Sequence, residues 1–137
     1  MSLPGNWTIE EILSLTYFKK VNLSIIYSAV ESFDCLDDLL NPTKPNEISN
    51  LFSKNELFET KVNPLEEAKI QIELCEKRNV HIVAFWDEKY PQLLKQIHLP
   101  PIILFVKGQL QNSDSVSIAI VGTRQCTTYG KMMAEEF

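Results

Sequence analysis

Apolar residues in the first 60 positions recur three and four residues apart, in short stretches separated by polar ones. This spacing places the apolar side chains on one face of a helix. We therefore expect five short helices, which begin near Thr8, Asn22, Asp34, Ile48 and Ser53. Together they predict a small all-helical domain over residues 1–62.

Polar residues at the helix starts support these assignments. Thr8 and Glu11 have the spacing of a capping box, in which each side chain accepts a hydrogen bond from the backbone N–H of the other residue. Residues 53–56 have the same spacing, and Asp34 is a candidate cap for the third helix. Turn-forming residues at 41–46 end that third helix.

The turn between the first two helices has two readings. Lys19 and Lys20 could contact DNA phosphates there, as in a helix–hairpin–helix motif. That motif needs a glycine so that the backbone can approach a phosphate, and residues 18–22 contain none. Residues 7–40 also carry two basic side chains against six acidic ones. A scaffold or a surface for protein contacts is the alternative.

The pattern changes after residue 62 to helix followed by strands. Asn63 is a cap, Pro64 fits the first helical position, and Asn79 is a left-handed stop. Three β-rich runs follow, at 80–85, 102–106 and 116–121, with a turn at 86–91 and a short helical piece at 93–97 between the first two. The third run is apolar or small on both faces, which is typical of a strand inside a parallel sheet. The fold class is therefore predicted as α/β, with residues 63–137 forming the first part of a Rossmann-like domain.

A candidate anion-binding loop follows the third predicted strand and precedes a helix over 131–137. Gly122 would allow a sharp turn there, and Gly130 would let the helix pack close to the sheet. Thr127 or Thr128 can cap the helix and leave N–H groups pointing at an anion. Arg124 offers a planar two-point donor for phosphate. A plain turn is the alternative reading, since glycine often follows a buried strand for geometric reasons alone.

Charge and composition narrow the function classes. The chain has 137 residues with 13 basic and 18 acidic side chains, a net charge of −5, which excludes a polycation that coats nucleic acid by charge alone. Residues 107–137 are neutral, with three groups of each sign. The three cysteines are far apart, so we expect no disulfide framework, no structural metal site and a reducing compartment. No apolar run approaches the ~18 residues of a membrane span and no signal peptide is evident, so we expect a cytoplasmic protein.

Four motifs in a fixed order resemble a known family. They are Tyr90-Pro91-x-Leu93-Leu94-x-x-Ile97, Pro100-Pro101-x-x-Leu104-Phe105-x-x-Gly108, Ile118-Ala119-Ile120-Val121-Gly122-Thr123-Arg124, and Thr127/Thr128-Tyr129-Gly130. The series resembles the DNA processing protein A family (DprA, also called Smf). The resemblance covers residues 86–137 well and extends to residue 63. The N-terminal helices match only in kind, as the sterile-alpha-motif-like domain of many members.

The resemblance implies a protein of natural transformation that binds and protects incoming single-stranded DNA and helps load the RecA recombinase. It implies no catalysis and no cofactor, and a homodimer for the full-length protein. DNA or phosphate contacts would come from the loop, at Gly122, Thr123, Arg124, Thr127, Thr128 and Gly130. The family's other basic residues and most of its sheet would lie beyond residue 137, so we expect an N-terminal fragment.

Two other functions remain open. A Rossmann-like nucleotide-processing enzyme, similar to the phosphoribohydrolases, would need a glycine-rich phosphate loop and a catalytic acid later in the chain. A protein-interaction module would use the helices to recruit a partner. Tyr129 could stack on a base or simply pack between helix and sheet.

Overall fold

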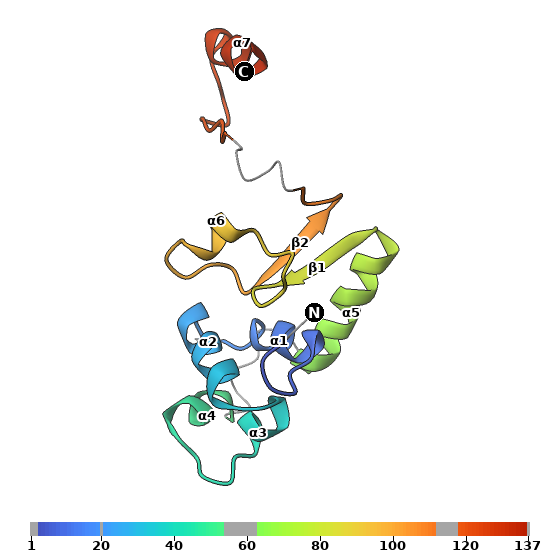
Figure 1. Ribbon diagram of the computed structural model, residues 1–137, viewed down its shortest axis with the longest axis vertical. Helices are drawn as coiled ribbons and strands as arrows, with labels where there is room; N and C mark the ends of the chain where they lie inside the picture. Colours follow the sequence, from blue (N-terminus) through green and yellow to red (C-terminus); the bar gives the residue numbers. More distant parts are fainter. Residues whose placement is uncertain (1–2, 20, 54–62, 112–117, 137) are drawn as a thin grey trace.

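The computed structural model describes residues 3–19, 21–53, 63–111 and 118–136 (Figure 1). Residues 3–19 and 21–53 contain four short helices: α1 (Ile9–Leu15), α2 (Leu23–Ser32), α3 (Leu36–Leu40) and α4 (Glu47–Phe52). The remaining elements are α5 (Pro64–Lys77), β1 (Val80–Ala84), α6 (Gln92–Lys95), β2 (Ile103–Lys107) and α7 (Thr128–Glu136). Within these described ranges, no helix has the length and apolar character needed to cross a bilayer.

The start of α1 confirms the predicted capping box. The Thr8 hydroxyl accepts from the Glu11 backbone N–H at 3.2 Å, and the Glu11 carboxylate accepts from the Thr8 N–H at 2.8 Å. Asn22 caps α2 by accepting from the Ile25 N–H at 3.0 Å. The first two predicted helices are thus confirmed, with ends that differ by a few residues.

The predicted cap of α3 is wrong. Cys35, not Asp34, stands at the cap position, and its side chain makes no capping hydrogen bond. Glu11 takes this role from a distance, because its second carboxylate oxygen accepts from the Leu36 N–H at 3.3 Å. The Asp34 carbonyl instead accepts from the Asn6 N–H at 2.8 Å. The predicted helix start at 53–56 lies mostly outside the described residues.

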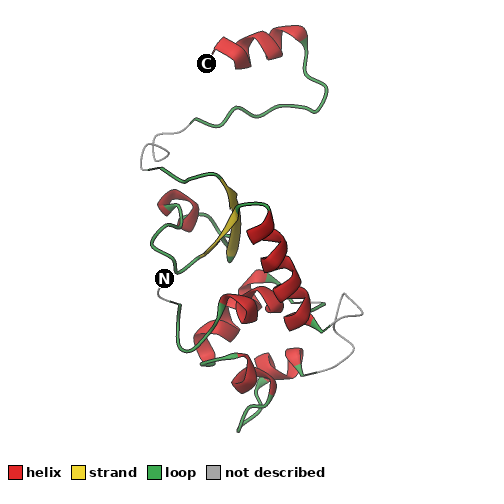
Figure 2. Cartoon of the chain, turned by 90° about the vertical axis from the view of Figure 1, so that its right-hand side faces the viewer, coloured by secondary structure: helices red, strands yellow, loops and turns green. Residues whose placement is uncertain are grey.

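The start of α5 confirms the second set of sequence signals. Asn63 accepts from the Leu65 N–H at 2.9 Å, and Pro64 stands at the first helical position. The helix ends at Lys77, and Asn79 has a φ of 52°, so the left-handed stop is confirmed. This helix packs along α1 and leads directly into β1 (Figure 2).

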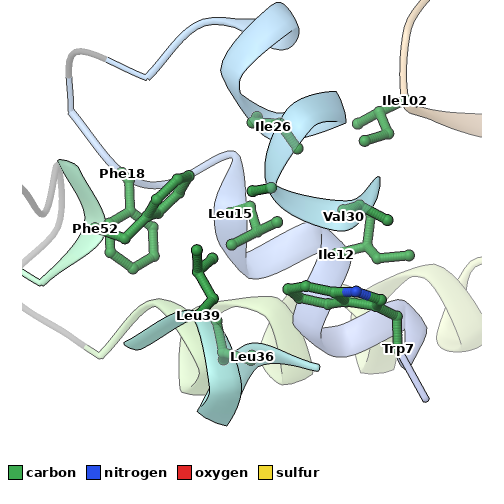
Figure 3. Close-up of a cluster of buried hydrophobic side chains, with 11 residues drawn as sticks. Trp7, Ile12, Leu15, Phe18, Ile26, Val30, Leu36, Leu39, Phe52 and Ile102 are labelled. Atoms are coloured by element: carbon green, nitrogen blue, oxygen red, sulfur yellow. The ribbon is translucent and has the colours of Figure 1, made fainter. Parts of the chain in front are cut away.

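The hydrophobic core is centred on the N-terminal helices but reaches into the second half of the chain (Figure 3). Trp7 is buried, and its indole N–H donates to the Phe33 carbonyl at 2.6 Å. Phe18 and Phe52 meet edge to face, with ring centroids 5.1 Å apart. Ile102, which directly precedes β2, belongs to the same cluster and is 2% exposed.

An aromatic cluster forms a second junction between the two halves of the chain. The ring of Tyr27 on α2 lies 5.1 Å from that of Phe85 and 5.9 Å from that of Trp86. Phe85 also contacts the ring of Tyr90 at 5.5 Å. The turn after β1 is therefore held against α2.

Two tyrosine hydroxyls tie this junction to a pair of prolines. The Tyr27 hydroxyl donates to the Pro100 carbonyl at 3.1 Å, and the Tyr90 hydroxyl donates to the Pro101 carbonyl at 2.7 Å. Burial raises the pKa of both hydroxyls above their ordinary value near 10. The folded protein therefore holds these phenolic protons more tightly than the unfolded chain does.

This difference predicts a loss of stability in alkali. The free energy of unfolding is expected to stay level up to about pH 9 and to fall as the pH rises above about 10, because the unfolded chain then releases phenolic protons that the folded protein retains. Tyr27→Phe should cost about 1 kcal/mol near neutrality through the lost hydrogen bond and should make the alkaline fall shallower. Urea titrations at a series of pH values measure both effects. A fall of the same steepness in Tyr27→Phe would remove Tyr27 as its source.

The sheet differs from the predicted one. The predicted strands at 80–85 and 102–106 are confirmed as β1 and β2, but they pair antiparallel, with Ile82 opposite Phe105. The short α6 between them is no crossover helix, and a parallel pair would need one. The third predicted strand is wrong for residues 118–121, which have no regular structure. A strand needs a partner for its backbone groups, and no described strand pairs with this segment.

Candidate anion-binding loop

The candidate loop leads into α7, and its threonines have distinct roles. The Thr127 hydroxyl accepts from the Gly130 N–H at 3.1 Å, and the Thr127 carbonyl accepts from the Lys131 N–H at 3.0 Å. Thr127 is therefore the cap of α7, which the sequence left open between two threonines, and Thr128 is the first helical residue. The hydroxyl of Thr123 donates to the Gln125 carbonyl at 2.8 Å and so bends the loop.

Two backbone donors at the start of α7 remain available. The first N–H groups of any helix lack partners within the helix. Here Thr127 takes up the N–H of Gly130, while those of Thr128 and Tyr129 have no partner among the described residues. Such donors, together with the positive end of the helix dipole, favour an anion at this position.

Arg124 is the cationic side chain of the loop. It is exposed, and within the described ranges its guanidinium makes no ion pair. Lys131, one turn into α7, lies 3.9 Å from the Glu135 carboxylate in an exposed pair. Both carboxylates of the described C-terminal segment, Glu135 and Glu136, lie at the far end of α7 from the cap. The cap end thus presents positive charge and backbone donors, and no acid of residues 118–136 lies beside them.

The predicted roles of the two glycines are not what the structure shows. Gly122 has no left-handed backbone conformation, and a side chain there would meet open space. The nearest atoms to a side chain at Gly130 are the Thr127 hydroxyl oxygen at 3.4 Å and Cys126 Cβ at 4.0 Å. These belong to the same loop and not to a sheet, because α7 does not pack on β1 or β2 (Figure 1).

Tyr129 lies on the first turn of α7 and is 69% exposed. Packing between helix and sheet was one reading of this residue, but its ring faces solvent in the described structure. The ring is close in sequence to the backbone N–H groups of Thr128 and Tyr129, which have no described partner, and to the cap. It is therefore available as a stacking surface next to the donors.

Sequence reasoning missed a groove beside the two-stranded sheet. The groove has a volume of about 720 Å³ and is lined by parts of β1, β2 and the segments that follow them. Leu93, which lies in the predicted helical piece, is 59% exposed and lines this groove. The signal in the sequence was the shortness of that piece, since a helix of only four residues buries little.

Comparison with known proteins identifies the segment that contains the loop. Residues 81–137 match the family of DNA recombination-mediator protein A. A stretch of 58 residues is 38% identical to the DNA processing protein DprA of Bacillus subtilis (strain 168). Residues 81–137 of this chain are similar to the DprA family. The predicted resemblance is thus confirmed for this part of the chain.

The match to the Bacillus DprA covers only part of each chain. The aligned stretch is 42% of this chain and spans 20% of the Bacillus DprA. The DprA segment includes β1, β2, the aromatic turn and the whole candidate loop, while α1 to α5 lie outside it. No solved structure matches the chain. The description of the matched family is that of a DNA recombination mediator.

Proposed function

We propose that this chain is the N-terminal part of a non-catalytic, cytoplasmic protein of natural transformation. It binds single-stranded DNA through residues 122–130, protects the incoming strand and assists the loading of RecA. The full-length protein acts as a homodimer, in which a sterile-alpha-motif-like domain of helices precedes a Rossmann-like domain. The observation that supports this most directly is the exposed Arg124 guanidinium, which pairs with no described acid, shortly before the start of α7 in the segment that matches the DprA family.

The chemistry of the loop suits a backbone phosphate. The N–H groups of Thr128 and Tyr129 can donate to one phosphate, and Arg124 can donate to it through two parallel N–H groups. These contacts read no base, so they hold any sequence. The net charge of −5 means that binding must be local. A protein that binds incoming DNA of any sequence needs this kind of contact.

The test is DNA binding by the 137-residue chain across a salt series. Fluorescence anisotropy with labelled oligo-dT is expected to show affinity that falls as salt rises. Arg124→Ala should weaken binding by about tenfold, the low end of a lost charge-assisted contact, and should reduce the slope of log affinity against log salt by about 0.7, the value for one phosphate on a single strand.

Lys77→Ala is the matched control for this test. Lys77 is an exposed cation on α5, paired with Glu73 at 3.8 Å and remote in sequence from the loop. Lys77→Ala removes one positive charge, as Arg124→Ala does. Equal losses of DNA affinity in the two variants would therefore show a general charge effect and contradict the proposed site. Absence of any binding to oligo-dT would overturn the proposal for this chain.

Tyr129 gives an independent prediction for the same site. If its exposed ring stacks on a base, Tyr129→Ala should weaken oligo-dT binding by about tenfold, since stacking on an aromatic ring contributes ~1–3 kcal/mol per base. Tyr129→Phe should keep nearly all of the affinity, because it keeps the ring. Binding to an abasic oligonucleotide should be insensitive to both changes. Equal losses for Phe and Ala would exclude stacking.

A further inference from the structure

Residues 91–100 form a loop whose two ends are fixed to each other. The hydroxyl of Tyr90, just before the loop, donates to the carbonyl of Pro101, just after it, at 2.7 Å. Tyr90 is 1% exposed and Ile102 is 2% exposed, so both ends are anchored in the interior. A compact surface loop whose ends lie close together is an Ω-loop, and loops of this kind frequently carry function.

The backbone on the two sides of Leu99 is held very differently. Each carbonyl of residues 100–102 accepts a hydrogen bond, two of them from tyrosine hydroxyls and the third from the Phe85 N–H at 2.9 Å. In the described part of the chain, the N–H groups of residues 97–99 donate no backbone hydrogen bond. The boundary between held and unheld backbone therefore falls at Leu99.

Leu99 has a backbone conformation that its side chain disfavours. Its φ is 52°, in the left-handed region, and among the described residues other than glycine only Asn79 shares this region, also at 52°. Asparagine tolerates the left-handed region, whereas leucine meets a steric cost there. The proline at position 100 adds to this cost, because a residue before proline prefers an extended backbone. Such strain persists only where the surrounding structure imposes it.

Few contacts hold the loop itself against the body of the protein. The Lys95 ammonium lies 5.2 Å from the centre of the Phe85 ring and 5.7 Å from that of Tyr90. Contacts of this kind are weak near solvent. Helix α6 has only four residues, none of them buried, and cannot be stable by itself. The loop can therefore leave the body without disturbing the anchors at its two ends.

We propose that residues 91–99 are a lid that opens by rotation of the backbone at Leu99. In the closed position, which the structure shows, Lys95 lies over the two rings and Leu99 is strained. In the open position the strain is released and the cation leaves the rings. Residues 91–93 form one wall of the groove beside the sheet, so opening widens that groove. The lid lies outside residues 122–130, and the proposal does not rest on DNA binding.

Limited trypsin digestion of the 137-residue chain tests the lid. Trypsin needs an extended segment around Lys95, so the initial rate of this cut follows the population of the open lid. Leu99→Asn should slow the cut by about fivefold, because it relieves part of the left-handed strain and so stabilises the closed lid. Leu99→Val should speed the cut, since a β-branched residue is less tolerated in this region.

Ile97→Asn is the matched control for Leu99→Asn. It places the same side chain two positions earlier, at a 49% exposed residue whose φ is not left-handed, and should leave the rate unchanged. The cut after Lys107, in β2, is the internal reference for unfolding of the whole protein. Equal rates in the wild type and both Leu99 variants would overturn the proposal. Equal slowing in Ile97→Asn, or a constant ratio of the Lys95 cut to the Lys107 cut in all variants, would overturn it as well.

Discussion

Phe52→Ala is expected to lower the free energy of unfolding by about 3–5 kcal/mol, as is usual when a large buried ring is removed. Phe52 is 2% exposed and is the last residue of α4. Its ring meets that of Phe18 at 5.1 Å, and an aromatic pair of this kind contributes about 0.5–1.5 kcal/mol beyond the area it buries. Helix α4 has only six residues, so its stability depends on tertiary packing of this kind. Urea unfolding followed by circular dichroism measures the change.

Leu51→Ala is the matched control for Phe52→Ala. Leu51 precedes Phe52 on the same short helix but is 40% exposed, so its truncation should cost under about 1 kcal/mol. Phe52→Leu, which keeps most of the volume, should fall between the two. A Phe52→Ala protein as stable as Leu51→Ala would show that α4 does not anchor the helical part.

Local signals predicted the helix starts well. Thr8 with Glu11, and Asn63 with Pro64, each act within four residues, and the structure has both. Asn79 is a further local case, because its left-handed conformation needs nothing from the rest of the chain. Such positions are decided by the backbone groups next to them. Sequence reasoning is therefore reliable there.

Predictions that depended on distant residues were wrong. Asp34 has the right residue type for a cap, but the donor it would serve is taken by Glu11 from 25 positions away. The strand expected over 116–121 has the right residue types for a buried strand, yet residues 118–121 pair with no described strand. The direction of β1 against β2 was likewise set by the connection between them and not by either strand's own sequence. The pattern of apolar and polar residues identifies which segments can form a helix or a strand. The groups that pack or pair with a segment decide whether it does.

The candidate site also combines features set by nearby residues, which the sequence predicted, with features set by distant ones, which it did not. The cap at Thr127 follows from local chemistry and was within the two choices that the sequence allowed. The exposure of Arg124 and Tyr129 could not be predicted, because it depends on what packs against α7. The close packing of α7 on a sheet, which Gly130 was predicted to allow, is not found with β1 or β2 for the same reason. The groove was missed because its walls come from three separate segments.

The boundary predicted at residue 62 has a direct test in the shared core. Ile102→Ala is expected to lower the free energy of unfolding by about 2–5 kcal/mol, since Ile102 is 2% exposed. The loss should appear on both sides of the boundary, because Ile102 packs in one cluster with Trp7, Ile26 and Val30 of the helical part. The expected result is one cooperative transition for residues 1–107 rather than two.

The two tryptophans allow unfolding on each side of residue 62 to be followed separately by fluorescence. Trp7 lies in the helical core and Trp86 in the aromatic cluster after β1, so Trp86→Phe and Trp7→Phe backgrounds each report on one side of the boundary. Ile102→Ala should lower the unfolding midpoint by the same amount in both backgrounds. Ile97→Ala, at a 49% exposed position in the same connection, is the control and should change neither. If Ile102→Ala shifts only the Trp86 signal, the helices fold independently, and Ile102 is then a contact between two domains rather than part of one core.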